Sequence, residues 1–219
     1  MILIQGTPLP DEIRIALVDM DGTATRSTDA LNFEATRRVF GNIGITIDRT
    51  TYSLAQGRSR EDGIEHILRA LNRDDLLADV SLLAEQKNRE ANIIRGNLTP
   101  EDVPREDRRI LQRLRDQGFL LALGTTSRNG LDTLNRVRLT SAFDVIVTGN
   151  EASIKTEIWQ LAFRYLDAKP SQAIVIEDAQ TGIDAAVNLG VTFSVGVGSG
   201  RLAATVNISS LSELQVERR

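Results

Sequence analysis

Residues 13–23 read IRIALVDMDGT, an almost wholly apolar run that ends in two carboxylates and a glycine. Such a run is typical of a strand inside a parallel sheet, because a strand covered on both faces does not alternate apolar with polar residues. Asp19 and Asp21 then lie two residues apart where the strand ends, and their repulsion needs a cation or a proton to offset it. An Asp-Gly turn also explains Asp21 and Gly22, so this stretch alone leaves a structural and a functional interpretation open.

The same pattern recurs along the chain. Further short apolar runs occupy residues 119–123, 145–147, 173–176 and 193–197, with amphipathic helical periods between them. This alternation predicts an α/β fold with a doubly wound parallel sheet, whose ligands bind at the carboxyl ends of the strands. Gly118 and Gly190 are expected to end two of the helices as left-handed caps. On another helix, Trp159 and Tyr165 are interpreted as core residues.

Residues 27–95 do not follow this rhythm and are expected to form consecutive helices. Ser59 and Asp62 resemble a capping box, and apolar residues with helical spacing follow them. A second helix is expected over residues 76–94, and Pro100 and Pro104 lie in the return linker. The sequence therefore predicts a core of residues 1–26 and 96–219, with a helical domain of residues 27–95 inserted after the first strand.

Composition excludes several classes of protein. The chain has 219 residues and no cysteine, which excludes thiolate catalysis and Cys-ligated zinc. A formal net charge of -4 argues against nucleic acid and anionic lipid as partners. No window approaches the roughly 20 apolar residues of a membrane span. We expect a cytoplasmic protein, monomeric or weakly dimeric, without a nucleic-acid or membrane partner.

Polar motifs follow the later strands as well. Residues 124–129 read GTTSRN, a hydroxyl-rich loop before a helix, where backbone N–H groups can bind an anion. Glu177 and Asp178 form a second acidic pair at a strand end. Lys155 lies between these motifs, in a chain that has only three lysines.

In this order the motifs resemble the four-motif set of the haloacid dehalogenase superfamily of phosphotransferases. The matching residues are Asp19-Met20-Asp21-Gly22-Thr23, then Thr125, then Lys155, then Glu177-Asp178 with TGIDAA at 181–186. Residues 57–62 and 83–88 are similar to the cap of its beta-phosphoglucomutase-like branch, and Ser127-Arg128-Asn129 is similar to its core loop.

The resemblance implies a role for each matched residue. Asp19 would be the nucleophile and Asp21 the general acid and base, while Thr125 and Lys155 bind the transferring phosphoryl group. A Mg²⁺ ion would be held by Asp19, Asp21 and Asp178, with Glu177 supporting it. The implied substrate-binding residues are Arg60, Thr126, Ser127, Arg128 and Asn129.

The function that this resemblance implies is a Mg²⁺-dependent phosphatase or phosphotransferase. It would form an aspartyl phosphate and act on a small phosphorylated metabolite, such as a sugar phosphate. Beta-phosphoglucomutase is the alternative, although Leu31 stands where the mutase has a histidine and Thr156 replaces the proline that usually follows the lysine.

Two further classes are weighed against this function. A catalytically silent phospho-ligand binding protein stays open, because fold resemblance does not establish activity. A phospho-accepting receiver fits poorly, because it lacks a helical cap. Within the cap-like stretch 83–88, Lys87 is interpreted as a solvent-facing helix residue, with a functional role as the alternative. His66 is interpreted as an exposed structural residue.

Overall fold

The structure, a computed structural model, describes residues 1–198 and 200–218, so residues 199 and 219 of the predicted core lie outside it. Its central feature is a parallel sheet in which six described strands follow the order β5-β4-β3-β6-β7-β8. The strands are β3 (Ile15–Asp19), β4 (Leu120–Gly124), β5 (Val145–Val147), β6 (Ala173–Glu177), β7 (Phe193–Val197) and β8 (Val206–Ile208). All neighbouring pairs are parallel, which confirms the predicted sheet.

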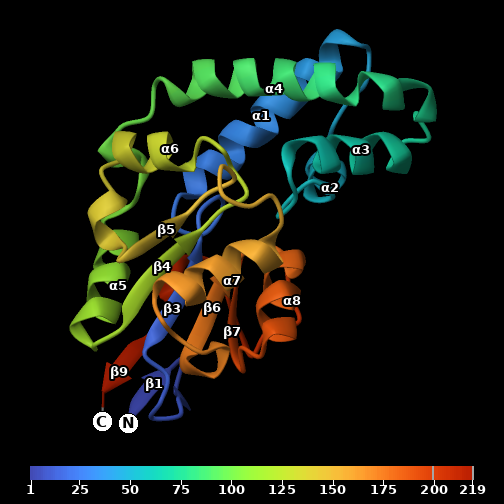
Figure 1. Ribbon diagram of the computed structural model, residues 1–219. Coiled ribbons are helices and arrows are strands. Elements are labelled where there is room, and N and C mark those ends of the chain that lie inside the picture. The colour runs from blue at the N-terminus through green and yellow to red at the C-terminus, as the bar shows by residue number, and fades with distance from the viewer. Residues whose placement is uncertain (199, 219) are drawn as a thin grey trace.

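Helices cover both faces of this sheet (Figure 1). One face packs against α5 (Arg105–Asp116) and α6 (Gly130–Arg136), and the other against α7 (Lys155–Tyr165) and α8 (Gln180–Leu189). Along β3, Ala16 and Val18 join the first cluster, whereas Ile15 and Leu17 join the second. Successive side chains of a strand point to opposite faces, so burial on both sides explains why the run is apolar throughout.

The structure confirms two predicted helix ends and contradicts one predicted core residue. Gly118 and Gly190 follow their helices with φ of +88° and +107°, which confirms the predicted left-handed caps. Trp159 is fully buried, as expected. The interpretation of Tyr165 is wrong, because its side chain is exposed. Tyr165 is the last residue of α7, and Phe163 takes the inward position at this end of the helix.

The helical segment lies beyond the end of β3 (Figure 1). It contains α1 (Arg26–Asn42), α2 (Arg49–Ser53), α3 (Arg60–Ala70) and α4 (Val80–Arg95). These helices have an apolar core of their own, which includes Phe40, Tyr52, Ile67 and Leu83. This separate core supports the predicted division into residues 1–26 with 96–219 and residues 27–95, which stays a prediction.

Local signals explain where two of these helices begin. The Ser59 side chain accepts a hydrogen bond from the Asp62 N–H at 3.3 Å, so the predicted cap starts α3. The second helix begins at Val80, later than predicted, because residues 74–79 form a 3₁₀-helix. Three of those six residues are aspartates, whose side chains compete with the backbone hydrogen bonds of an α-helix.

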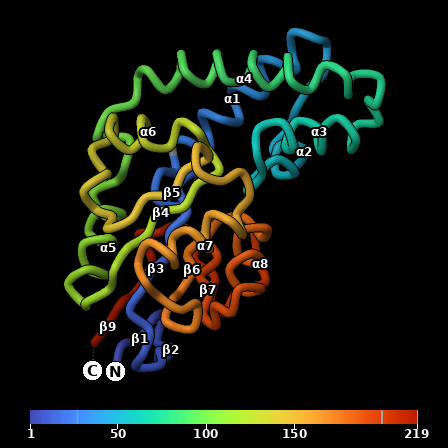
Figure 2. Tube along the Cα trace, viewed as in Figure 1, coloured from blue at the N-terminus to red at the C-terminus, as the bar shows by residue number. Residues whose placement is uncertain are grey.

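Strand β8 of the central sheet and a second, small sheet were not predicted from the sequence. β1 (Ile2–Ile4) pairs in antiparallel fashion with both β2 (Thr7–Pro8) and β9 (Val216–Arg218). This pairing brings the two ends of the chain together (Figure 2). Among the described helices, none has the length and apolar composition needed to cross a membrane.

Candidate active site

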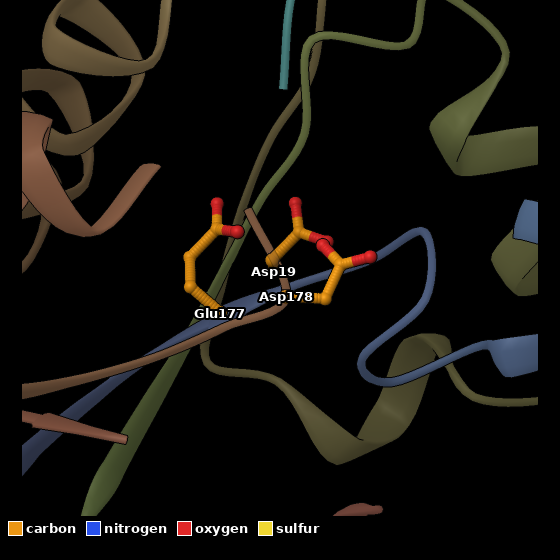
Figure 3. A group of neighbouring side chains, drawn as sticks. All are labelled: Asp19, Glu177 and Asp178. Atoms are coloured by element: carbon orange, nitrogen blue, oxygen red, sulfur yellow. The ribbon is translucent and has the colours of Figure 1, made fainter. Parts of the chain in front are cut away.

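Acidic side chains from two neighbouring strands meet at one end of the sheet. Asp19 ends β3 and Glu177 ends β6, and these two strands are paired directly. Together with Asp178, they offer three carboxylate oxygens that all lie within 4.8 Å of one another (Figure 3). Burial raises the pKa of Asp178, and the charges of Asp19 and Glu177 raise it further. The cluster therefore favours a proton or a cation among its oxygens.

Gly22 allows the Asp178 carboxylate to lie close to the backbone of the turn after β3. Its φ is +87°, and a Cβ atom there would lie 2.0 Å from Oδ2 of Asp178. The turn around it is held by the Thr25 N–H, which donates to the Met20 carbonyl at 2.8 Å. The Asp-Gly turn expected from the sequence is present, and it places the backbone after Asp21 against Asp178.

Lys155 compensates part of the acidic charge. It is the first residue of α7, and its buried ammonium group contacts Oδ1 of Asp19 and lies 2.7 Å from Oε1 of Glu177. It also donates to the Gly124 carbonyl at 2.9 Å and lies 4.6 Å from the centre of the Trp159 ring. Burial disfavours the charged amine, but Asp19 and Glu177 outweigh this effect and raise the pKa of Lys155. Lys155 therefore keeps its proton.

The same partners act on Asp19 in opposite directions. Burial raises the pKa of Asp19, the charge of Lys155 lowers it, and Glu177 and Asp21 raise it again. The net shift of this pKa is upward because burial, the largest of these effects, together with the two carboxylates outweighs the ammonium group of Lys155. An additional cation beside Asp19 stabilises its ionised form.

The loop after β4 places Thr125 beside this cluster. Thr125 is buried, and its hydroxyl accepts a hydrogen bond from the Ser127 N–H at 3.0 Å. The N–H groups of Thr125 and Asn129 donate to Val147 and Ser127. Three backbone N–H groups of the loop are therefore already bonded within the protein. The helix that follows, α6, has only seven residues and begins at Gly130.

Two side chains of this loop hold the helical segment. The Thr126 hydroxyl donates to the Arg58 carbonyl at 3.0 Å, and Nδ2 of Asn129 donates to Oδ1 of Asn88 at 2.9 Å. Gly57 lies equally close to the core, since a Cβ atom there would be 2.2 Å from the Thr181 hydroxyl. The helical segment is therefore closed onto the strand ends.

A pocket lies between the core and the helical segment. Its empty space, open mouth included, is about 980 Å³. Every predicted site residue except the fully buried Glu177 lines it: Asp19, Asp21, Arg60, Thr125, Thr126, Ser127, Arg128, Asn129, Lys155 and Asp178. The fold thus brings the predicted set together around one space.

The side of α4 that faces the pocket was not predicted from the sequence. Lys87, Ala91 and Arg95 all line the pocket, so the interpretation of Lys87 as a solvent-facing residue is wrong. Their spacing of four residues puts them on one side of a helix and was the available signal. His66 does not line the pocket, and its half-exposed side chain lies 3.1 Å from Asp62.

The pocket also contains residues from α1. Nδ2 of Asn32 donates to Oδ1 of Asp21 at 3.2 Å. The neighbouring Leu31 is buried against Ala35 and Ala91. Burial raises the pKa of Asp21, although a hydrogen bond with Thr28 and the charge of Arg95 oppose the shift. The Asp21 carboxylate therefore accepts a hydrogen bond from the Asn32 amide, which carries no titratable proton.

We expect Lys87 to titrate near pH 8. Burial lowers the pKa of Lys87 to about 8, and the charge of Arg60 contributes to the shift. Lys87 is thus charged below this pH and neutral above it, so its attraction for an anionic ligand weakens between pH 7 and 9. NMR of ¹³C-methylated lysines measures this titration. The spectrum is simple because the chain has only three lysines. One signal should titrate near pH 8 and be missing in Lys87→Met. A Lys87 signal that moves only above pH 10 contradicts the expectation.

Comparisons with known proteins agree with this architecture. The family model for haloacid dehalogenase-like hydrolases matches residues 16–196. A beta-phosphoglucomutase of Bacillus subtilis is 31% identical over 212 residues, which cover 94% of this chain and 93% of the relative. A phosphorylated carbohydrates phosphatase of Thermotoga maritima is 29% identical over 187 residues, 83% of each chain. The crystal structure of beta-phosphoglucomutase from Clostridium difficile superposes with a TM-score of 0.82 at 27% identity, over 93% of both chains.

Proposed function

The chain belongs to the haloacid dehalogenase-like hydrolase family, and from this premise we propose that it is a Mg²⁺-dependent phosphatase or phosphotransferase that acts on a phosphorylated sugar through an aspartyl phosphate. One observation carries the proposal. Asp19 is a buried carboxylate at a strand end, contacts the ammonium group of Lys155 and lines the same pocket as Thr125. A nucleophile beside a fixed cation and a hydroxyl is suited to attack on a phosphate ester.

The proposed reaction has two steps. An Asp19 oxygen attacks phosphorus, the P–O ester bond breaks, and the leaving oxygen takes a proton from Asp21. Asp21, now ionised, then accepts a proton from water or a sugar hydroxyl, which attacks the phosphorus and frees Asp19. The raised pKa of Asp21, caused by its burial, suits the acid of the first step. Lys155 and Thr125 bind the phosphoryl oxygens and neutralise their charge.

The acidic cluster fits a divalent metal. Its donors are carboxylate oxygens, which Mg²⁺ prefers. Burial raises the pKa of Asp178, and the negative charges of Asp19 and Glu177, which a cation would offset, raise it further. Asp19, Asp178 and the Asp21 main-chain carbonyl would hold the ion, with Glu177 behind them. A bound Mg²⁺ would offset repulsion between the Asp19 carboxylate and the incoming phosphate.

The rest of the substrate is proposed to contact Arg60, Ser127 and Arg128, which line the pocket. Arg60 has no ion-pair partner in the described part of the chain, and burial together with the charge of Arg128 lowers its pKa. Thr126 and Asn129 also line the pocket, but their side chains already donate to the helical segment. Their proposed contact with substrate is therefore limited to the remaining acceptor atoms.

Phosphatase is the first choice and beta-phosphoglucomutase the second. Leu31 has no proton to exchange with Asp21, which favours the phosphatase. The 31% identity to a beta-phosphoglucomutase over nearly the whole chain favours the mutase. Both activities use the same two aspartates and differ in which hydroxyl accepts the phosphoryl group.

A phosphatase screen with Mg²⁺ tests the proposal. Phosphate release is measured from sugar phosphates, nucleotides and phosphoglycolate, and β-glucose 1-phosphate is incubated with and without a bisphosphorylated sugar primer. We expect phosphate release from at least one sugar phosphate without primer. Isomerisation that requires the primer indicates the mutase. A folded protein that binds sugar phosphates without turnover is a binding protein, and the proposal is then wrong.

A further inference from the structure

Arg95 is a buried cation that makes no direct ion pair among the described residues. It is the last residue of α4, is only 5% exposed and lines the pocket. Its side chain donates to the amide oxygen of Asn92, and in the described part of the chain it makes no ion pair with a carboxylate. By contrast, Arg26, which is more exposed, lies 2.9 Å from Asp107. The charges of Asp21 and Asp132 act on Arg95 only from a longer distance, so a direct partner for this buried charge is left to a ligand anion.

Lys87 extends this positive surface along α4. Lys87, Ala91 and Arg95 follow one another at intervals of four residues and all line the pocket. These three residues form a stripe along α4. Its two ends, Lys87 and Arg95, are about 12 Å apart along the helix axis at 1.5 Å per residue. Ala91, between them, has a small side chain and leaves room for a ligand group. Lys87 makes no ion pair among the described residues either.

The stripe faces the position of the leaving oxygen. Ala91 packs against Leu31, and the neighbouring Asn32 donates to the Asp21 carboxylate. The charge of Asp21 acts on both Arg95 and Lys87, in agreement with this placement. In the proposed mechanism, Asp21 donates its proton to the oxygen that leaves phosphorus. Chemical groups on the carbon next to that oxygen would therefore lie against α4. Arg60 is on a different helix, α3.

We propose that Arg95, with Lys87 beside it, binds an anionic group of the substrate close to the ester oxygen. This inference rests on the proposed function, because Asp21 marks the ester oxygen only if it is the general acid. The substrate is then a phosphorylated sugar or polyol that carries a carboxylate or a second phosphate near the phosphate that is removed. Arg95 is the residue that selects this class, because its planar guanidinium matches carboxylate and phosphate oxygens.

Three probes with one carbon skeleton test the selectivity. Glycerol 2-phosphate has no second anion, 2-phosphoglycerate has a carboxylate beside the ester, and glycerol 1,2-bisphosphate has a phosphate there. We expect kcat/KM of the wild type to favour one charged probe over glycerol 2-phosphate by at least about tenfold, the effect of ~1.4 kcal/mol. A preference for 2-phosphoglycerate identifies the anionic group as a carboxylate, and a preference for glycerol 1,2-bisphosphate identifies it as a phosphate.

Variants assign the preference to Arg95. Arg95→Met should remove most of the preference, and Arg95→Lys should keep part of it because the positive charge stays. Arg89→Met is the matched control, since Arg89 is an exposed residue of the same helix and should leave the preference unchanged. If Arg95→Met does not fold, the wild-type preference and Arg95→Lys decide the question.

Two outcomes overturn the inference. The first is a wild type that does not prefer either charged probe. The second is an equal loss on all three probes in Arg95→Met, which means that Arg95 acts through Asp21 or through folding. Calorimetric binding of 2-phosphoglycerate and glycerol 1,2-bisphosphate separates this result from failure of the proposed function. A protein without turnover that still binds a charged probe through Arg95 refutes the function and keeps the site.

Discussion

Asp19→Asn should abolish phosphoryl transfer while the protein stays folded. The substitution keeps the shape of the side chain but replaces the attacking carboxylate with an amide, which does not attack phosphorus. We expect kcat to fall by at least a thousandfold, or about 4 kcal/mol in the activation barrier. The measurement is phosphate release from the best substrate of the screen, with p-nitrophenyl phosphate as a second substrate.

Stability measurements separate this loss from unfolding. Asp19 is buried among other acids, and Lys155 keeps Glu177 as a partner after the substitution. The melting temperature of Asp19→Asn should therefore be equal to that of the wild type or higher. Asp11→Asn is the control, because Asp11 is an exposed residue outside the pocket and should retain full activity. Activity of Asp19→Asn within tenfold of the wild type would falsify the proposed mechanism.

The central sheet was predictable because its signal is local. Three of the predicted strands, β3, β6 and β7, are buried along their whole length, and burial on both faces removes most polar residues from such a run. The strand ends were predictable for the same reason, because Asp19 and Glu177 are polar residues placed directly after such runs. Parallel strands end at one edge, so the acidic residues had to meet there.

The parts that were missed depend on contacts between distant segments. β1 and β9 are three-residue strands from opposite ends of the chain, and neither has a pattern long enough to identify it alone. Lys87 and Arg95 are of residue types that are common on the exposed face of a helix. Only the closure of the helical segment onto the core, through Arg58 and Asn88, turns their side of α4 toward the pocket.

Removal of divalent metal should abolish activity and lower stability together. The pKa of Asp178 is raised by burial and then by Asp19 and Glu177, so a bound cation stabilises the folded protein as well as the reaction. We expect EDTA to stop phosphate release and Mg²⁺ to restore it. At a Mg²⁺ concentration 100 times its Kd, binding adds about 2.7 kcal/mol to the free energy of unfolding, or roughly 5 to 10 °C in melting temperature.

Two comparisons locate that metal effect. Asp178→Asn should lose the Mg²⁺-dependent rise in melting temperature, because it removes a proposed ligand. Asp184→Asn, an exposed aspartate on α8, should keep the rise. Ca²⁺ should raise the melting temperature but support little turnover, because its looser coordination does not align Asp19 with the phosphate. Full activity in metal-free buffer, or a Mg²⁺ effect that survives in Asp178→Asn, contradicts a metal site at Asp19 and Asp178.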